Sequence, residues 1–282
     1  MAIKLPNFSM PPWAQHVDVH CERLSADANA EPINLYSTAI YLVAAYLAYQ
    51  FGKRTDTLNQ ASKRLIWIMA LVALCGFIFH RQATAWSMYL DSVPMYAFQI
   101  TFVYLYSSFM TRNQNKPELS ATFITVGFVA LHVLISMLPS SNLDGTASVV
   151  PMLIFLAIFA YFHNHNVRRY STILWLAVIS WGIAIFLKYI DIEACDYQRF
   201  GTHSLWHVAS AAAMLFAVMG VLATKLDGRY MRSKKARGEH DYKKLKAIES
   251  LNPHDVIGFD EPTLSLTKPN AAKTPVSTKP KK

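Results

Sequence analysis

Two histidines four residues apart, His203 and His207, stand at the start of a long apolar segment of the sequence. At about 100° per residue, this spacing puts both imidazoles on one face of a helix, where their nitrogens can reach one metal ion. A third histidine, His80, ends another apolar segment, and Asp91 begins the next. Three imidazoles and a water make the tetrahedral shell of a catalytic zinc, and a carboxylate beside the water can act as general base or orient a ligand. These residue types predict a zinc centre, if the fold brings the four side chains together.

The elements that must position them are those of a membrane protein. Of the 282 residues, 53% are hydrophobic and only 16% are charged, which is too apolar for an ordinary soluble domain. Seven apolar runs are long enough to cross about 30 Å of hydrocarbon. They are residues 33–51, 65–83, 90–110, 119–138, 147–163, 172–190 and 204–224. Because they are continuously apolar, we expect helices and not barrel strands. The predicted fold class is an all-α, seven-helix integral membrane bundle.

Basic residues in the short connections indicate the orientation of the bundle. They follow the first, third and fifth runs, while the other connections are neutral or acidic; the basic residues are Lys53, Arg54, Lys63, Arg64, Arg112, Lys116, Arg168 and Arg169. By the positive-inside rule, we expect an extracytoplasmic N-terminus and a cytoplasmic C-terminus. The three histidines and Asp91 then lie at one depth, in the outer half of the membrane. Ionisable residues at such depths face the bundle interior and are candidates for function.

Polar segments flank the predicted membrane domain, residues 33–224. Residues 1–32 are expected to be an extracytoplasmic segment, without the apolar stretch of a cleavable signal peptide. Residues 225–282 hold 14 Lys or Arg against 7 Asp or Glu, and the first part of this tail suits anionic lipid headgroups. Its remainder, rich in Pro, Thr, Ser and Lys, is expected to be disordered. No phosphate-binding glycine loop, nucleophile elbow or nucleic-acid motif occurs, so a nucleic acid partner is not expected.

The spaced motifs resemble those of the alkaline ceramidase family. The run His80–Met95 resembles that family's histidine, eleven-residue step to an aspartate, and Pro-Met pattern. Residues 203–207 (His-Ser-Leu-Trp-His) are similar to its His-Ala-Leu-Trp-His signature, and residues 21–22 (Cys-Glu) and 31–34 (Glu-Pro-Ile-Asn) resemble its approach to the first helix. The resemblance covers about residues 18–224. It relates the chain to a wider group of seven-helix membrane hydrolases that includes adiponectin and progestin receptors.

The resemblance implies an enzyme, a ceramidase-like amidohydrolase acting on linear amides in sphingolipid metabolism. Zinc would be bound by His80, His203 and His207, and Asp91 would be the catalytic residue, acting on the water that the metal activates. The substrate implied is ceramide or a related N-acyl lipid, cleaved at its amide bond.

One position departs from the family pattern. Ceramidases carry a serine four residues before the first zinc histidine, and this chain has Gly76 there. Loss of an oxyanion donor of this kind can cost on the order of 100- to 1,000-fold in rate, so the departure bears on the substrate. Thr84 and Ser87 are the hydroxyls expected to be able to replace it.

Animal relatives hold calcium near the N-terminus, and the resemblance therefore extends to a possible calcium site. Glu22 and Glu31 match two of its positions, but Val19 and Leu24 replace an aspartate and an asparagine. Because calcium takes six to eight oxygen ligands, the alternative is a solvated acidic pair that caps the first helix.

The resemblance also implies a disulfide between Cys21 and Cys195, which would both face an oxidising compartment. Such a bond would tie the N-terminal segment over the mouth of the site. Cys75 has no evident partner and is interpreted as core packing. His16 and His20 lie on the outer side, and nothing in the sequence fixes them at the zinc centre.

Two alternatives to a ceramidase stay open. In a membrane receptor or structural bundle, zinc would only join helices, and a fourth protein ligand would close its coordination shell. A hydrolase of other lipid amides or of esters is the second alternative. For the location, we expect a bacterial inner membrane, although an endomembrane would give the same topology.

Overall fold

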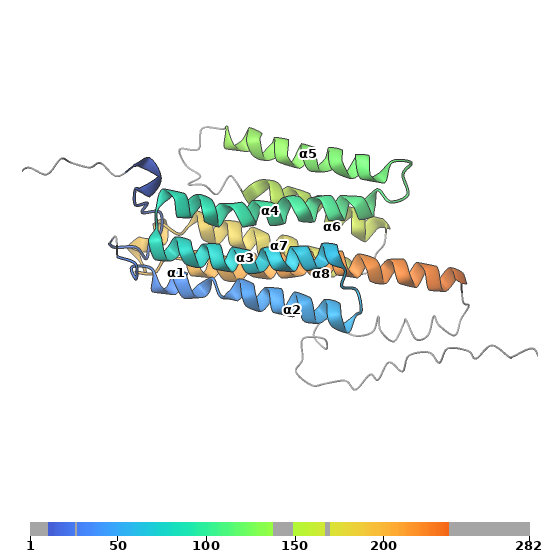
Figure 1. Ribbon diagram of the computed structural model, residues 1–282, viewed down its shortest axis with the longest axis horizontal. Coiled ribbons are helices and arrows are strands. Elements are labelled where there is room, and N and C mark those ends of the chain that lie inside the picture. Colours follow the sequence, from blue (N-terminus) through green and yellow to red (C-terminus); the bar gives the residue numbers. More distant parts are fainter. Residues whose placement is uncertain (1–10, 26, 138–148, 167–169, 237–282) are drawn as a thin grey trace, which may run out of the picture.

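The apolar runs of the sequence fold as helices. The structure, a computed structural model, describes residues 11–25, 27–137, 149–166 and 170–236, and the side chains among them except those of 166 and 227–236. In this part of the chain the regular structure is helical, and the β-type pairing is limited to an isolated bridge between His16 and Thr84. The helices lie side by side along a common direction (Figure 1). The all-α expectation is confirmed.

From α2 to α8 the helices follow one another in antiparallel order along the bundle, and α1 precedes α2 in the same direction (Figure 1). Their bounds, in chain order, are η1 Pro12–Ala14, α1 Pro32–Ser37, α2 Ile40–Arg54, α3 Gln60–Gln82, α4 Ala85–Met110, α5 Pro117–Ser136, α6 Val150–Asn166, α7 Ser171–Tyr189, η3 Glu193–Asp196 and α8 His203–Ala236. Helix α8 packs along α7 and α2 and also contacts α1, α3 and α4. Its buried small residues, Ala211, Ala213 and Ala217 among them, allow this close approach to several neighbours. Helix α5 packs on α4 and lies at the edge of the bundle (Figure 1).

Four of the described helices are long and apolar enough to cross a membrane, and the chain is a membrane protein by this measure. They are α3, α5, α7 and the part of α8 from His203 to Leu226, while the apolar segment Val150–His165 of α6 is shorter. Helix α5 exposes large apolar side chains, with Phe123 at 67% and Leu134 at 61% of their full accessibility. In water this surface would be costly, but facing lipid it is favourable.

The first expected span, 33–51, is wrong as one continuous helix, because it is divided into α1 and α2 at Thr38 and Ala39. Just before the break, the Ser37 hydroxyl donates to the Asn34 carbonyl at 2.8 Å and the Thr38 hydroxyl donates to the Leu35 carbonyl at 2.7 Å. Such side-chain bonds compete with the helical ladder. The break brings Ser37 and Thr38 toward α8 and α3, as described below.

Two other boundaries differ from expectation. Helix α4 begins at Ala85 and not near residue 90, because Thr84 and Ser87 form a capping box at its start. Asp91 therefore lies in the second turn of the helix and not at its beginning. Helix α8 runs past residue 224 to Ala236 and extends beyond its neighbours (Figure 1). The rest of the expected tail, 237–282, lies outside the described residues.

Candidate metal centre

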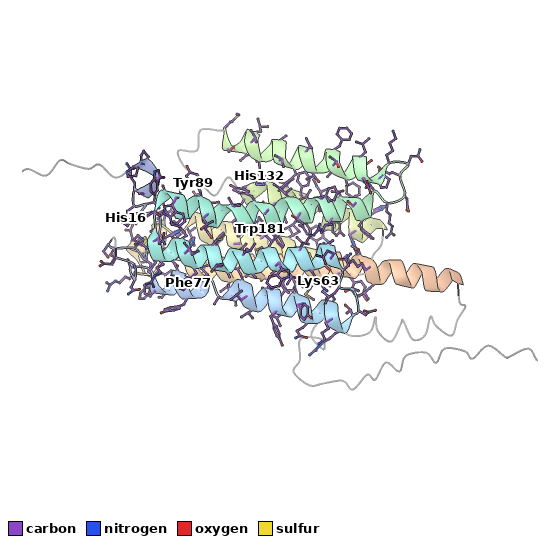
Figure 2. The ribbon with its side chains drawn as sticks, in the orientation of Figure 1. His16, Lys63, Phe77, Tyr89, His132 and Trp181 are labelled. Carbon is purple, nitrogen blue, oxygen red and sulfur yellow. A yellow bond between two sulfur atoms is a disulfide. The ribbon has the colours of Figure 1, made fainter. Side chains whose placement is uncertain are left out.

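One end of the bundle gathers the polar residues. The start of α1, the end of α3 and the starts of α4 and α8 meet there with the N-terminal segment (Figure 1). A disulfide joins Cys21 of that segment to Cys195 of η3, with their Cα atoms 5.4 Å apart. This is the pairing that the resemblance implied. Figure 2 labels His16 at this end and Lys63 at the opposite end of the bundle.

Four imidazoles converge behind the disulfide. His80, His203 and His207 are buried, and His20 is nearly so. The metal-binding nitrogens of His20, His80 and His203 lie within 4.8 Å of one another, and Nε2 of His207 is 3.3 Å from Nε2 of His80. Imidazole nitrogens are the preferred ligands of zinc and of several other divalent metals. The cluster can therefore hold a metal ion.

The spacing of His80, His203 and His207 suits a tetrahedral ion. Ligands at 2.0–2.1 Å from a tetrahedral zinc are about 3.3 Å apart, and the centres of the bound rings are about 5 Å apart. The ring centres of His80 are 5.3 Å from those of His203 and 5.0 Å from those of His207, and His203 and His207 are 4.7 Å apart. Their planes are inclined by 62° to 77° to one another, as expected for rings that point at a common centre.

Hydrogen bonds behind the rings decide which nitrogen faces the centre. Nδ1 of His80 is 2.7 Å from the Glu31 carboxylate, which only accepts, so this nitrogen carries the proton. Nδ1 of His207 is 2.6 Å from the Ser37 hydroxyl, whose own proton goes to the Asn34 carbonyl. That nitrogen must also be the donor. Both Nε2 atoms then present lone pairs to the centre, which is the arrangement of metal-binding histidines.

Asp191 fixes the start of α8 and so the position of His203. Its Oδ1 accepts the backbone N–H groups of Thr202 at 2.6 Å and His203 at 2.8 Å. Gly201, with φ +60°, makes this possible, because a Cβ there would lie 2.3 Å from Asp191 Oδ1. Burial raises the pKa of Asp191, but the nearby His20 and the hydrogen bonds from the backbone of Thr202 and His203 outweigh burial and hold the pKa below its ordinary value.

Asp91 lies one helix away, against Gly76. A Cβ on Gly76 would be 3.2 Å from Asp91 Oδ1 and 3.1 Å from Thr38 Cγ2, so these two side chains share the space beside this position. Gly76 is one turn before His80 on the same face of α3, and the Asp91 carboxylate interacts electrostatically with His80 and Lys188. Gly76, the residue that departs from the family pattern, thus lies directly against the Asp91 carboxylate.

The two hydroxyls expected to replace the family serine are used elsewhere. Ser87 Oγ is 3.0 Å from the backbone nitrogen of Thr84 and 2.9 Å from the Thr84 hydroxyl, within the capping box of α4. The expectation that either serves the metal centre is therefore wrong. Their role is to begin the helix that carries Asp91.

His20 is the fourth imidazole of the cluster, and the sequence did not fix its position at this centre. Its ring centre lies 3.7 Å from that of His203, with the planes inclined by 34°, so the two rings stack. Its Nδ1 is 3.9 Å from Asp191 Oδ2, and its buried Nε2 has no hydrogen-bond partner among the described residues. Burial lowers the pKa of His20. His20 is therefore a neutral ring that covers one side of His203.

The calcium expected at Glu22 and Glu31 does not fit the residues present. The Glu22 carboxylate accepts the backbone N–H groups of Ile33 at 2.7 Å and Asn34 at 2.8 Å, at the start of α1. The Glu31 carboxylate is bonded to His80 and to the guanidinium of Arg23. Its oxygens thus already face a cation, and calcium would need six to eight free oxygens.

The alternative, a solvated acidic pair, is also wrong in part. Glu22 does cap the first helix, but it is only 5% exposed and Glu31 only 1%. Burial raises the pKa of Glu31, yet its hydrogen bonds to His80 and to Arg23 outweigh burial and lower the pKa to about 2. Both carboxylates are structural anions of the interior.

Three residues of this end were missed from the sequence: Arg23, Ser37 and Asp191. A signal existed for the first, since a basic side chain inside a segment expected to bind calcium is out of place. Asp191 stood in a loop with Glu193 and Asp196, and its distinction from them depends on contacts with the start of α8 and with the N-terminal segment that the sequence does not show. Ser37 was hidden inside an apolar run.

A comparison with protein families agrees with this arrangement. A family model described as Ceramidase matches residues 20–248, which include all four imidazoles and Asp91. No curated protein and no solved structure matches the chain.

Proposed function

Since the chain belongs to the ceramidase family, we propose that it is a zinc-dependent membrane hydrolase that cleaves the amide bond of ceramide-type lipids. The family acts on lipid amides, and the finer assignment concerns the metal, the substrate and the residues. In this proposal His80, His203 and His207 bind the zinc and Asp91 is the catalytic residue.

The observation that carries the proposal is the pair of facing Nε2 atoms of His80 and His207. Nδ1 of each ring is a donor, so in the neutral imidazoles both Nε2 atoms carry lone pairs, and these atoms are 3.3 Å apart. Two lone pairs at this distance in a buried site repel each other unless a cation lies beside them. A zinc ion at tetrahedral distance from both removes the repulsion.

The chain's own residues supply the remaining chemistry. Zinc would polarise the amide carbonyl and lower the pKa of a water to about 7. Asp91 takes the proton that the water loses as its oxygen bonds to the carbonyl carbon. It then delivers that proton to the leaving nitrogen as the carbon–nitrogen bond breaks. Glu31 and Ser37 hold two of the imidazoles, so that the lone pairs stay aimed at the ion.

We propose seven membrane spans, with α1 and α2 together as the first. Helix α4, from Ala85 to Met110, and the segment from Pro32 to Arg54 each exceed the roughly 20 residues that a span needs. The disulfide suits an extracytoplasmic position of the metal-centre end, and the basic residues around Lys63 suit a cytoplasmic opposite end. A membrane-impermeant maleimide should label a cysteine at exposed Asp196 (D196C) in intact cells, but not one at exposed Glu118 (E118C). The reverse pattern would refute this orientation.

The rival function, a bundle that zinc only joins, requires a fourth protein ligand, and His20 is the candidate. In its favour, a ring nitrogen of His20 lies within 4.8 Å of nitrogens of His80 and His203, and its Nε2 has no hydrogen-bond partner among the described residues. Against it, the 3.7 Å stacking of His20 on His203 is too close for two rings that point at one tetrahedral ion, which would be about 5 Å apart. The ring geometry thus supports three histidine ligands and an open fourth position.

Metal analysis tests the ligand set. Purified protein should contain about one zinc per chain, and His203→Ala should lose it. His132→Ala is the matched control, since His132 lies on α5 near Gln99, with 3.2 Å between His132 Nε2 and Gln99 Oε1, and should keep the metal. Zinc retained by His203→Ala would overturn the assignment.

An activity panel tests the reaction. Wild type and Asp91→Ala are incubated with fluorescent ceramides, N-acyl amines and lipid esters. We expect turnover of ceramides by the wild type and a loss of about 100-fold or more in the variant, as for removal of a general base. Equal turnover by the two proteins would exclude Asp91 as the base, and turnover of esters alone would replace the amidase by an esterase.

A further inference from the structure

A buried guanidinium lies directly behind the metal centre. Arg23 is 5% exposed, in the N-terminal segment two residues after the disulfide. Burying such a charge is costly unless it is paired and fully hydrogen-bonded. What surrounds Arg23 therefore indicates what it does.

All three nitrogens of the Arg23 guanidinium donate hydrogen bonds. Its Nε donates to Glu31 Oε1. Its Nη1 donates to the carbonyls of Ser25 at 3.0 Å and Asp27 at 3.2 Å, and its Nη2 donates to the carbonyl of His80 at 2.9 Å. One carboxylate oxygen and three carbonyl oxygens thus converge on a single cation, which is the kind of ligand set that a calcium ion takes.

The same side chain holds His80 at two points. Through Glu31 it acts on the imidazole, because the carboxylate that pairs with Arg23 also accepts the proton of His80 Nδ1 at 2.7 Å. Through Nη2 it acts on the backbone, because the His80 carbonyl is in the last turn of α3, where carbonyls lack a helical partner. The position and the tautomer of this imidazole both depend on Arg23.

Resting on the proposed zinc site, we propose that Arg23 is a positioning residue that takes the place of a structural calcium ion. Its guanidinium holds Glu31 and the end of α3 so that His80 is set for the metal. Because the cation is part of the chain, metal binding and stability do not depend on calcium. Lysine cannot replace it, since an ammonium is a point charge without the planar fork that reaches Glu31 and three carbonyls.

The first experiment measures zinc affinity by competition with a chelator for wild type, Arg23→Lys, Arg23→Ala and Arg81→Ala. Arg81 is exposed and adjacent to His80, and its variant is the matched control. We expect Arg23→Ala to weaken zinc binding by about 10- to 100-fold, as for loss of an outer partner of a ligand, with Arg23→Lys weakened similarly and Arg81→Ala unchanged. Wild-type affinity in folded Arg23→Ala or Arg23→Lys would overturn the proposal.

Chemical rescue separates positioning from general folding. Millimolar methylguanidinium should restore the zinc affinity of Arg23→Ala toward that of the wild type, and millimolar methylammonium should not. Equal failure of both would show that Arg23 only supports the fold. If Arg23→Ala does not fold, the lysine variant carries the affinity measurement alone.

The calcium arm uses wild-type protein and thermal unfolding. Neither millimolar calcium nor a calcium-selective chelator should change the melting temperature. Stabilisation by calcium would overturn the proposal. These readouts do not involve turnover, so a protein that binds zinc through Arg23 but cleaves no lipid amide would refute the proposed function and leave this inference intact.

Discussion

Replacement of Asp191 is expected to destabilise the fold. The carboxylate accepts two backbone N–H groups at the start of α8, and its other oxygen faces the Cys21 nitrogen at 3.5 Å. Loss of an N-cap acceptor costs about 1–2 kcal/mol, and loss of a partly buried negative charge at a helix start costs up to about 2 kcal/mol more. For Asp191→Ala we therefore expect a loss of about 2–4 kcal/mol, and for Asp191→Asn, which keeps an acceptor, about 1–2 kcal/mol.

The assay is thermal unfolding of detergent-purified protein. For a chain of this size 1 kcal/mol corresponds to about 2–4 °C, so Asp191→Ala should melt about 5–15 °C below the wild type. Asp196→Ala, the same chemical change at an exposed position of the same loop, serves as control and should melt with the wild type. Equal melting of Asp191→Ala and wild type would refute the view that this carboxylate fixes the start of α8.

The pH dependence follows from the depressed pKa of Asp191. A carboxylate with a lowered folded-state pKa contributes stability that is complete above its unfolded pKa of about 3.9 and is lost as pH falls through the folded pKa. The difference in melting temperature between wild type and Asp191→Asn should therefore be largest near neutral pH and shrink as the solution is acidified below about pH 4. A difference that grows on acidification would contradict the assigned charge.

Three further predictions concern the neighbours of the metal centre. His20→Phe should keep about one zinc per chain by metal analysis, because the His20 ring lies 3.7 Å from that of His203 and is not among the proposed ligands; loss of the zinc would favour the closed site. Gly76→Ala should keep its zinc but turn over ceramide about tenfold more slowly, because the new methyl would lie 3.2 Å from Asp91 Oδ1 and displace it. Unchanged turnover would show that the methyl does not displace the Asp91 carboxylate. Cys21→Ser should lower stability by about 2–5 kcal/mol in thermal unfolding, whereas Cys75→Ser, at a free cysteine, should change it little. Equal melting temperatures of the two variants would show that the disulfide does not stabilise the fold.

The sequence predicted what depends on local pattern. The spacing of His203 and His207 fixes one helical face, and continuous apolar runs predict long helices, because both follow from the 3.6-residue period of a helix. The break at Thr38 was not predicted, since two hydroxyls in an apolar run carry no signal of their competition for backbone carbonyls. The boundary of α4 was placed late because the apolar pattern begins after the capping box.

Contacts over long separations account for the rest. Asp191 and Asp196 are equivalent by sequence, and only the fold, which brings the start of α8 and the N-terminal segment to Asp191, distinguishes them. Arg23 and Glu31 could be read as solvated charges, because their burial depends on α3 being present behind them. Resemblance to a family suggested a calcium ion there, and in the proposed arrangement the Arg23 guanidinium supplies the cation from within the chain.

The disulfide and the Arg23 contacts have a consequence for biogenesis. Residues 20–31 leave the ribosome early, but the groups that fix them, His80, Asp191 and Cys195, follow 57 to 174 residues later. This early segment is therefore held in place only after nearly the whole bundle has been made. Closure of the bond between Cys21 and Cys195 requires that α7 and the loop before α8 have reached the membrane. This bond thus marks a chain whose insertion is nearly complete, and trapping of its free thiols during synthesis would report how far each chain has progressed.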